Sequence, residues 1–192
     1  MPKKSKGTFG STPTSIYQLK ITLNDVHPPV WRRVQVGDCS LAELHYIIQA
    51  CMGWDNCHLH AFEVDGVAYS DPEMGGGADF CDSHSRKLSQ LASQGPSRFT
   101  YQYDFGDDWQ HVVEIEKTVP PEPKGKYPRC TEGKRACPPD DCGGAYGYEE
   151  FVEAIQDRKH AEHKDMLEWV GGKFDPEKFD MKKVNRKLQR VG

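Results

Sequence analysis

Acidic side chains and a histidine crowd one short stretch of the chain, YQYDFGDDWQHVVEIE at residues 101–116. Carboxylates beside an imidazole can bind a divalent cation, or they can transfer protons as general acid and base. Ligands that converge around an open coordination position would make a metal-dependent hydrolase acting on phosphoesters or nucleic acid. The candidate catalytic residues on this hypothesis are Asp104, Asp107, Asp108, His111 and, from a later loop, Asp141.

The same stretch has a purely structural interpretation, which we favour. Asp107 or Asp108 can hydrogen-bond the backbone of a tight turn, as Asx residues do. Neighbouring carboxylates would also repel one another unless a cation or a hydrogen-bond donor lay between them. On this interpretation the stretch is a β-hairpin, and its polar tip is turn chemistry.

The register of this hairpin follows from the burial of one face. A loop at 106–108 would pair Phe105 with Trp109 and Tyr103 with His111, so that one face is aromatic and apolar throughout. His111 would then be buried against Tyr103 and Trp109, on the opposite face from the first aspartate of the stretch.

A long segment without hydrophobic periodicity follows the hairpin. Residues 120–147 contain six prolines and five glycines, and we expect them to form a loop. Ordered loops of this length are uncommon and are usually functional or held by a staple. We expect this loop to be ordered and to dock on the hairpin at 98–117.

Three cysteines in this loop offer thiolates, which are soft ligands that favour zinc over magnesium or calcium. Their C-x6-C-x4-C spacing differs from the C-x2-C of common zinc motifs. A fourth ligand could come from His111 or Asp141, and the alternatives are three free thiols or one labile disulfide. The predicted zinc ligands are Cys130, Cys137 and Cys142.

Two further motifs carry weaker signals. The sequence CHLH offers Cys57, His58 and His60, and two strand histidines at this spacing share a face that could bind a metal; such pairs more often decorate a surface or pack in a core. The last helix carries a run of cations without an acid, which is a candidate nucleic-acid surface, although a solvated helix face is the usual explanation. These cations are Lys182, Lys183, Arg186, Lys187 and Arg190.

Composition narrows the class of protein. The 192 residues carry a net charge of −4, which argues against a dedicated nucleic-acid binder. No apolar run is long enough to cross a bilayer, so we expect no membrane partner. The polar residues 1–13 read as a disordered tail rather than a signal peptide, and a cytoplasmic location follows by default. Seven cysteines, an odd number, argue against a full disulfide framework.

Hydrophobic periodicity predicts one domain at residues 14–192 with strands before and after a helix. The order predicts an α+β fold: a small mixed or antiparallel sheet with a β-grasp-like core and a C-terminal helical region. In chain order we expect strands at 15–26 and 30–36, a helix at 41–52 between Ser40 and Gly53, a hairpin at 58–70, a helical turn near 88–91, the hairpin at 98–117, and helices around 148–155, 166–170 and 176–188.

Three motifs together resemble a known family. The stretches YQYDFGDDWQH, ACPPDDCGGAYGYEEF and MGWDNCHLHAFEV, in residues 14–191, are similar to those of the plasmid pRiA4b ORF-3-like proteins. The resemblance implies an α+β fold and a protein carried as a passenger of plasmids and mobile elements, with no settled activity. No residue matches a recombinase active site, so a resolvase activity does not follow.

The sequence leaves two function classes open and does not decide whether the protein is an enzyme. Our leading hypothesis is a non-enzymatic binding or adaptor module for a protein or nucleic-acid partner, with a possible structural zinc ion. The alternative is the metal-dependent hydrolase described above.

Overall fold

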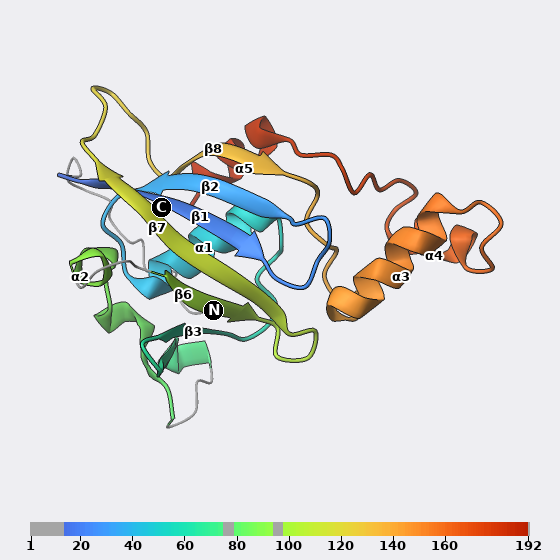
Figure 1. Cartoon of the computed structure of the whole chain (residues 1–192), viewed down its shortest axis with the longest axis horizontal. Helices are drawn as coiled ribbons and strands as arrows, with labels where there is room; N and C mark the ends of the chain where they lie inside the picture. The colour runs from blue at the N-terminus through green and yellow to red at the C-terminus, as the bar shows by residue number, and fades with distance from the viewer. Residues whose placement is uncertain (1–13, 75–78, 94–97, 192) are drawn as a thin grey trace, which may run out of the picture.

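The computed structural model describes residues 14–74, 79–93 and 98–191 (Figure 1). The tail expected at residues 1–13 lies outside this part of the chain. In order, the elements are β1 (Ile16–Leu23), β2 (Trp31–Val36), α1 (Leu41–Met52), β3 (His60–Val64), β4 (Val67–Ser70), the 3-10 turn η1 (Pro72–Met74), β5 (Cys81–Asp82), the 3-10 turn η2 (Ser83–Ser85), α2 (Leu88–Ala92), β6 (Arg98–Tyr103), β7 (Trp109–Val119), β8 (Arg129–Lys134), α3 (Gly144–Gln156), α4 (His163–Trp169) and α5 (Met181–Leu188).

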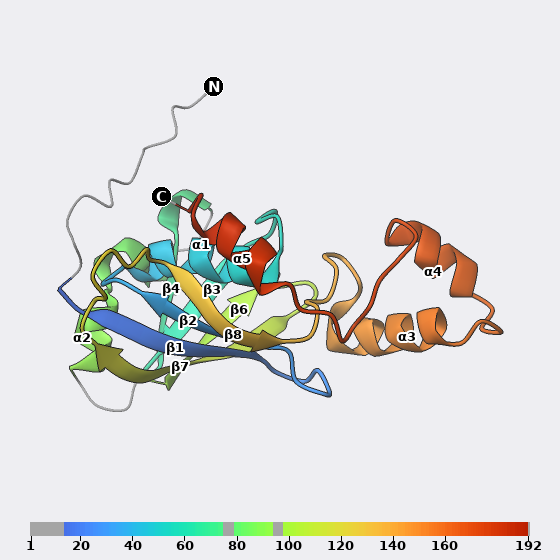
Figure 2. The same ribbon diagram turned by 90° about the horizontal axis from the view of Figure 1, so that it is seen from above.

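The strands form one eight-stranded sheet in the order β5-β4-β3-β6-β7-β1-β2-β8. All neighbouring pairs are antiparallel except β4 and β5, which pair in parallel. Helices α1 and α5 lie on the same face of this sheet, as Figure 2 shows from above. The α+β class predicted from the order of elements is therefore confirmed.

Alternation along the strands explains which face carries the core. In β1, the side chains of Leu19, Ile21 and Leu23 are buried, while the residues between them are only partly covered. Successive strand residues point to opposite faces, so this pattern gives the sheet one apolar face for α1 and one polar face. Tyr101 and Val113 continue the apolar face on β6 and β7.

Helix α1 begins and ends where the sequence predicts. Ser40 accepts a hydrogen bond from the Glu43 amide, and the Glu43 carboxylate accepts one from the Ser40 amide, which completes a capping box. Gly53 ends the helix in the left-handed region at φ 112°, where a residue without Cβ is favoured. Helix α1 thereby delivers the residues that follow it to one end of the sheet.

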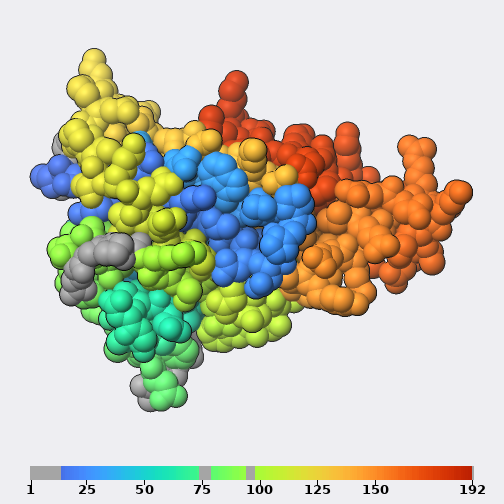
Figure 3. Space-filling model, in the orientation of Figure 1, coloured from blue at the N-terminus to red at the C-terminus, as the bar shows by residue number. Residues whose placement is uncertain are grey.

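Helices α3 and α4 project from that end of the sheet, and the chain then returns to it as α5 (Figures 1 and 3). The buried residues of helix α5 are Val184 and Leu188. Its cap is Asp180, whose side chain accepts a hydrogen bond from the Lys183 amide, so the start expected near Asp175-Pro176 is wrong. A proline after aspartate marks only a turn here, because the helical hydrogen bonds begin five residues later.

Two edge strands are absent from the sequence prediction. Residues 129–134, expected to belong to a long loop, form β8 and pair with β2. Only Cys130 of this strand is buried, so no apolar alternation marks it. The two-residue β5 also lacks an apolar pattern that could have predicted it, because both of its residues are exposed. Each is an edge strand that pairs with one neighbour only. Its position is therefore set by hydrogen bonds to that neighbouring strand and not by a pattern in its own sequence.

The β6–β7 hairpin has a different register from the one expected. Tyr103 pairs with Trp109, and Tyr101 pairs with His111, so a five-residue turn at 104–108 replaces the three-residue loop. The shift is two residues, which preserves the faces. His111 is fully buried, as predicted, but Tyr101 rather than Tyr103 lies opposite it. Phe105 lies in the turn and is 43% exposed.

Among the residues described, no helix combines the length and the apolar character needed to cross a bilayer.

Candidate functional site

Three loops meet at one end of the sheet: residues 54–59 after α1, the hairpin turn at 104–108, and residues 138–144 before α3. We call this place the loop junction. The Asp104 amide donates to the Leu59 carbonyl at 2.8 Å, which joins the first loop to the second. These loops follow the ends of different elements, so the fold brings together residues that are distant in the sequence.

The third loop is attached to both of the others. Trp54 Nε1 donates to the Pro138 carbonyl at 3.0 Å, and the Gly143 amide donates to Asp107 Oδ2 at 3.2 Å. The expected docking on the hairpin therefore occurs at the hairpin's turn. Gly144 lies so close that a Cβ there would be 2.5 Å from the Asp107 carbonyl oxygen.

His58 is the histidine at the junction. Its Nδ1 lies 3.5 Å from Asp104 Oδ2, and its Nε2 lies 3.2 Å from Asp141 Oδ1. The ligand atoms of these three residues all lie within 4.8 Å of one another. The His58 side chain is 27% exposed, so solvent reaches the group. His58 precedes β3, and the expectation that it shares a strand face with His60 is wrong.

Asp104 hydrogen-bonds the backbone of the turn, a role expected from the sequence for Asp107 or Asp108. Its backbone is left-handed at φ 58°, and its Oδ1 accepts hydrogen bonds from the Gly106 amide at 2.9 Å and the Asp107 amide at 3.4 Å. Aspartate tolerates this conformation because its short side chain hydrogen-bonds locally. Oδ1 therefore holds the turn, and Oδ2 faces His58.

A second group of potential ligands overlaps the first. Cys57, His58 and Asp140 also bring their ligand atoms within 4.8 Å of one another. Burial raises the pKa of the Asp140 carboxyl group, and its Oδ1 is buried without a hydrogen-bond partner in the described part of the chain. The hydroxyl of Tyr103 accepts a hydrogen bond from the Cys57 amide at 3.2 Å and lies 3.8 Å from Cys57 Sγ.

The five candidate catalytic residues do not converge. All four aspartates belong to loops of the junction, but the Asp108 carboxylate is engaged elsewhere: it accepts hydrogen bonds from Gln102 and Gln110, both at 2.6 Å, on the polar face of the sheet. His111 lies in the core, where its ring Nδ1 faces the carbonyl oxygens of Trp109 and Tyr101. The Asp108 carboxylate and the His111 ring therefore have other partners than the residues around His58.

The second histidine of the CHLH motif has a core role that the sequence signalled only weakly. His60 is buried and stacks on His45, with ring centroids 3.5 Å apart and planes 7° apart. His45 also contacts the Tyr101 hydroxyl at 2.8 Å and Asn56 Oδ1 at 2.6 Å. Burial lowers the pKa of His45 to about 3 and that of His60 to about 4, so both rings are neutral near pH 7.

The three loop cysteines do not form a compact ligand group. Within residues 14–74, 79–93 and 98–191, no set of ligand atoms within 4.8 Å of one another contains them together. Burial raises the pKa of each thiol, which disfavours the thiolate that zinc needs. The cysteines concerned are Cys130, Cys137 and Cys142.

A buried cation lies beside these thiols. The Arg32 side chain is almost fully buried, and its guanidinium donates to the carbonyls of Cys51 at 3.0 Å, Trp31 at 2.8 Å and Lys134 at 2.8 Å. Burial lowers its pKa, and the nearby thiols, Cys137 first, act in the opposite direction. A permanent positive charge next to the sulfur atoms disfavours a second cation there.

Basic residues of α5 and of the turn that follows it line a shallow groove. Its lining consists of Lys182, Asn185, Arg186, Gln189 and Arg190. In the described part of the chain, no carboxylate lies within 4.0 Å of these three cations. Of the other two cations of the run, Lys187 donates to the Gly53 carbonyl at 2.9 Å, and Lys183 is exposed.

The helix is fixed beneath this groove by its amide side chains. Asn185 Oδ1 accepts from the Cys130 amide at 2.8 Å, and Asn185 Nδ2 donates to the Cys130 carbonyl at 2.9 Å. Gln189 Nε2 donates to the Pro128 carbonyl at 3.0 Å. The cations are therefore displayed on an element that is held against β8.

These features define an α+β protein with a mostly antiparallel sheet, a Cys–His–Asp cluster where three loops meet, and a basic groove on its last helix. Residues 15–183 match the family model for the plasmid pRiA4b ORF-3-like protein, and the chain belongs to this family. The resemblance found in the sequence motifs is thereby confirmed.

Two relatives are similar over most of their length. The uncharacterized protein y4hQ of Sinorhizobium fredii (strain NBRC 101917 / NGR234) is 38% identical over 175 residues, which cover 90% of each chain. The crystal structure of MM3350, a protein of unknown function from Methanosarcina mazei Go1, has a TM-score of 0.82 and 38% identity. That match covers 89% of this chain and 98% of the other.

Proposed function

We propose that this protein is a non-enzymatic binding module that engages the phosphate backbone of nucleic acid through the groove on α5. The observation that carries the proposal is a row of cations along this groove that no carboxylate neutralises by ion pairing within the described residues. Clustered positive charge of this kind supplies the sequence-independent part of nucleic-acid binding. The cytoplasmic location expected from the sequence would expose the protein to such a partner.

The spacing of the cations supports a polyphosphate chain as the ligand. Lys182 and Arg186 stand four residues apart in α5, so they lie on one helix face about 6 Å apart along the axis, and Arg190 follows in the turn just after the helix. This interval is comparable with the separation of successive phosphates along a nucleic-acid strand. The planar guanidinium of each arginine can donate two parallel hydrogen bonds to a phosphate, as a lysine cannot.

The overall charge and the lack of aromatic residues limit the kind of contact. The net charge of −4 means that attraction is confined to this groove rather than spread over the surface. No aromatic residue lines the groove, so stacking on bases does not contribute. We therefore infer moderate affinity, little sequence preference and a strong dependence on salt.

The dispersion of the candidate catalytic residues argues against the hydrolase alternative. A hydrolytic metal site needs its ligands and its general base around one open position. Asp108 hydrogen-bonds glutamines on the polar face, and His111 is buried in the core. A binding module requires no such convergence.

The test is fluorescence anisotropy of a labelled DNA duplex of two helical turns, titrated with protein at several salt concentrations. Three phosphate contacts predict a slope of log K against log salt of about −2.7, or about 40-fold weaker binding between about 50 and 200 mM salt. Replacement of Lys182, Arg186 and Arg190 together by glutamine should abolish the slope and most of the affinity.

A matched control keeps the change of net charge the same. Lys159, Lys164 and Lys173 are exposed residues of the α3–α4 region, and their joint replacement by glutamine also removes three positive charges. This control should bind DNA as the original protein does. If both triple variants bind DNA equally weakly, the loss of affinity comes from net charge alone, and the groove is not the binding site. The same titration with a single-stranded RNA of equal length tests whether a phosphate backbone alone, without a DNA duplex, is enough for binding.

A further inference from the structure

We propose that the loop junction is a zinc site whose protein ligands are Cys57 Sγ, one imidazole nitrogen of His58 and Asp140 Oδ1. This inference is independent of nucleic-acid binding by α5. It replaces the thiolate site expected at Cys130, Cys137 and Cys142 with a different set of ligands, of which Asp140 alone comes from the same loop. The zinc ion would hold the loop after α1 to the loop before α3.

The donor set is chemically suited to zinc. Zinc binds thiolate sulfur, imidazole nitrogen and carboxylate oxygen, usually with four ligands in a tetrahedron. Cys57, His58 and Asp140 supply one donor of each kind, and the donor atoms lie within 4.8 Å of one another. Magnesium and calcium prefer oxygen ligands alone, so a thiol beside an imidazole selects against them. A water molecule or one of the neighbouring carboxylates would complete the tetrahedron.

An unpartnered buried oxygen provides a second, separate observation. Asp140 Oδ2 accepts a long hydrogen bond of 3.4 Å from the Asp55 amide, but Oδ1 is buried and accepts none from any residue that the structure describes. A buried carboxylate oxygen without a partner is unfavourable, and a cation is the strongest partner that it can have.

The surroundings of His58 match those of a metal-bound imidazole. Ligand histidines usually direct their other ring nitrogen to a carboxylate, which fixes the orientation and the tautomer of the ring. Asp104 lies 3.5 Å from Nδ1 and Asp141 lies 3.2 Å from Nε2, so either nitrogen can bind zinc while the other keeps a carboxylate. Nε2 is buried and makes no hydrogen bond of normal geometry within residues 14–74, 79–93 and 98–191, despite the short distance to Asp141.

The proposed ligands are also accessible in the manner that loading requires. Cys57 is exposed, so zinc can reach its sulfur from solvent. The Cys57 amide donates to the Tyr103 hydroxyl at 3.2 Å and Trp54 Nε1 donates to the Pro138 carbonyl, and these hydrogen bonds hold the backbone around the site. Binding would therefore need little rearrangement of the loops.

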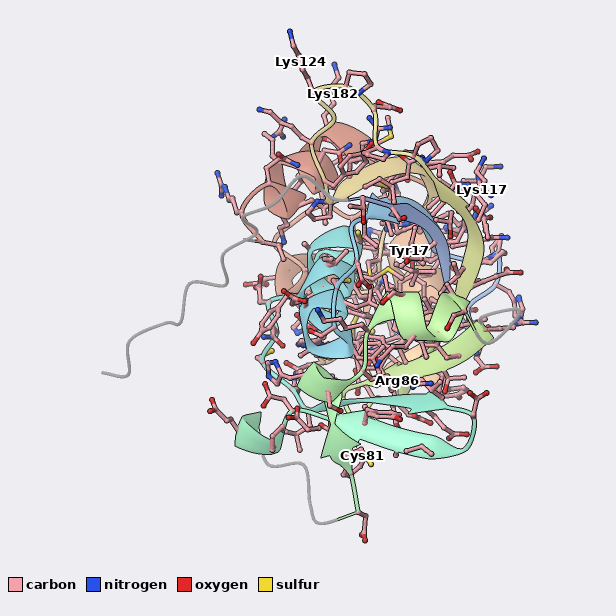
Figure 4. All side chains as sticks on the ribbon, turned by 90° about the vertical axis from the view of Figure 1, so that its left-hand side faces the viewer. Tyr17, Cys81, Arg86, Lys117, Lys124 and Lys182 are labelled. Carbon is pink, nitrogen blue, oxygen red and sulfur yellow. The ribbon has the colours of Figure 1, made fainter. Side chains whose placement is uncertain are left out.

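The first experiment measures zinc bound to the purified full-length chain after dialysis against excess zinc and removal of the unbound metal. One zinc ion per chain is expected. Cys57→Ser and Asp140→Asn should weaken zinc binding by more than 100-fold, whereas Asp104→Asn should weaken it by about 10- to 100-fold because it only orients the imidazole. The matched control is Cys81→Ser, a second exposed cysteine at the far end of the sheet from Lys182 of α5 (Figure 4).

The second experiment uses the unmodified protein and so does not depend on the folding of a variant. Alkylation of Cys57 by iodoacetamide, followed by mass spectrometry, should slow at least about 10-fold when zinc is added, because a metal-bound thiolate is protected. Alkylation of Cys81 in the same sample should not change. Equal alkylation of Cys57 with and without zinc would overturn the proposal, as would full zinc content in Cys57→Ser. Loss of zinc only when Cys137 and Cys142 are replaced would place the metal on those two thiols instead and would also overturn the proposal.

Discussion

Acid should destabilise the protein through His111, a group that is buried, neutral and far from solvent. Its Nδ1 lies 3.0 Å from the Trp109 carbonyl oxygen and 3.2 Å from that of Tyr101, so this nitrogen carries the proton and donates. Nε2 is buried without a partner among the described residues. Burial lowers the pKa of His111 from its ordinary value of 6.5 to about 4.

The direction of the pH effect follows from this pKa. Because the folded protein binds the proton more weakly than the unfolded chain does, the stabilisation is complete above pH 6.5 and is lost as the pH falls toward 4. Between about pH 7 and pH 5, this one group should lower the free energy of unfolding by about 2 kcal/mol. His45 and His60 act in the same direction, so the whole protein should lose more.

Urea unfolding at a series of pH values isolates the contribution of His111. The variant His111→Asn keeps an amide that can donate to the backbone, loses the titration, and should be less stable at neutral pH because it leaves a cavity. Its loss of stability between about pH 7 and pH 5 should be smaller than that of the original protein by about 2 kcal/mol. The exposed His27→Asn variant should leave the pH dependence unchanged. Parallel pH curves for His111→Asn and the original protein would refute the reasoning.

Two further predictions concern packing between loops and strands. Gly144→Ala should lower the free energy of unfolding by about 3 kcal/mol, because a Cβ would lie 2.5 Å from the Asp107 carbonyl oxygen at a φ of +69°. Gly171→Ala is the control, because Gly171 has a similar φ of +84° but a Cβ there would meet no atom within 4 Å. This variant should lower the free energy of unfolding by only about 1 kcal/mol. The difference between the urea midpoints of the two variants then gives the cost of the contact with Asp107. Asn185→Ala leaves the amide and carbonyl of Cys130 without their side-chain partner, and it should lower stability by about 2 kcal/mol and speed hydrogen exchange at the Cys130 amide. Unchanged exchange at that amide would show that Asn185 does not hold α5 to β8.

Strong local signals allowed much of the fold to be predicted from the sequence. The capping box at Ser40 and Glu43, the Asp65-Gly66 turn and the aromatic face of the β6–β7 hairpin each have a local physical cause, and each is present. The exact pairing of that hairpin failed because a shift of two residues keeps every side chain on its face. Burial alone could not distinguish the two registers.

The candidate site depended on contacts that no local pattern encodes. His58 was a weak signal because its neighbour His60 suggested a strand pair, whereas His58 belongs to the loop before β3. Asp140 and Cys57 are 83 positions apart in the sequence, and only the folded chain brings their ligand atoms together. Thiol spacing pointed instead to Cys130 and its neighbours, because spacing reports on local loops and not on long-range convergence.

The burial of Arg32 has a consequence for how the edge of the sheet opens. Strand β8 is an edge strand, and such strands usually fray alone and offer free backbone groups to other chains. Here the Lys134 carbonyl on β8 solvates the guanidinium, together with the Cys51 carbonyl in the last turn of α1, where the helix dipole favours a cation. Detaching β8 would strip one of these partners from a charge that cannot be released as a proton. The edge strand and the end of α1 should therefore exchange their amide hydrogens as one cooperative unit, which guards this edge against strand addition by a neighbouring molecule.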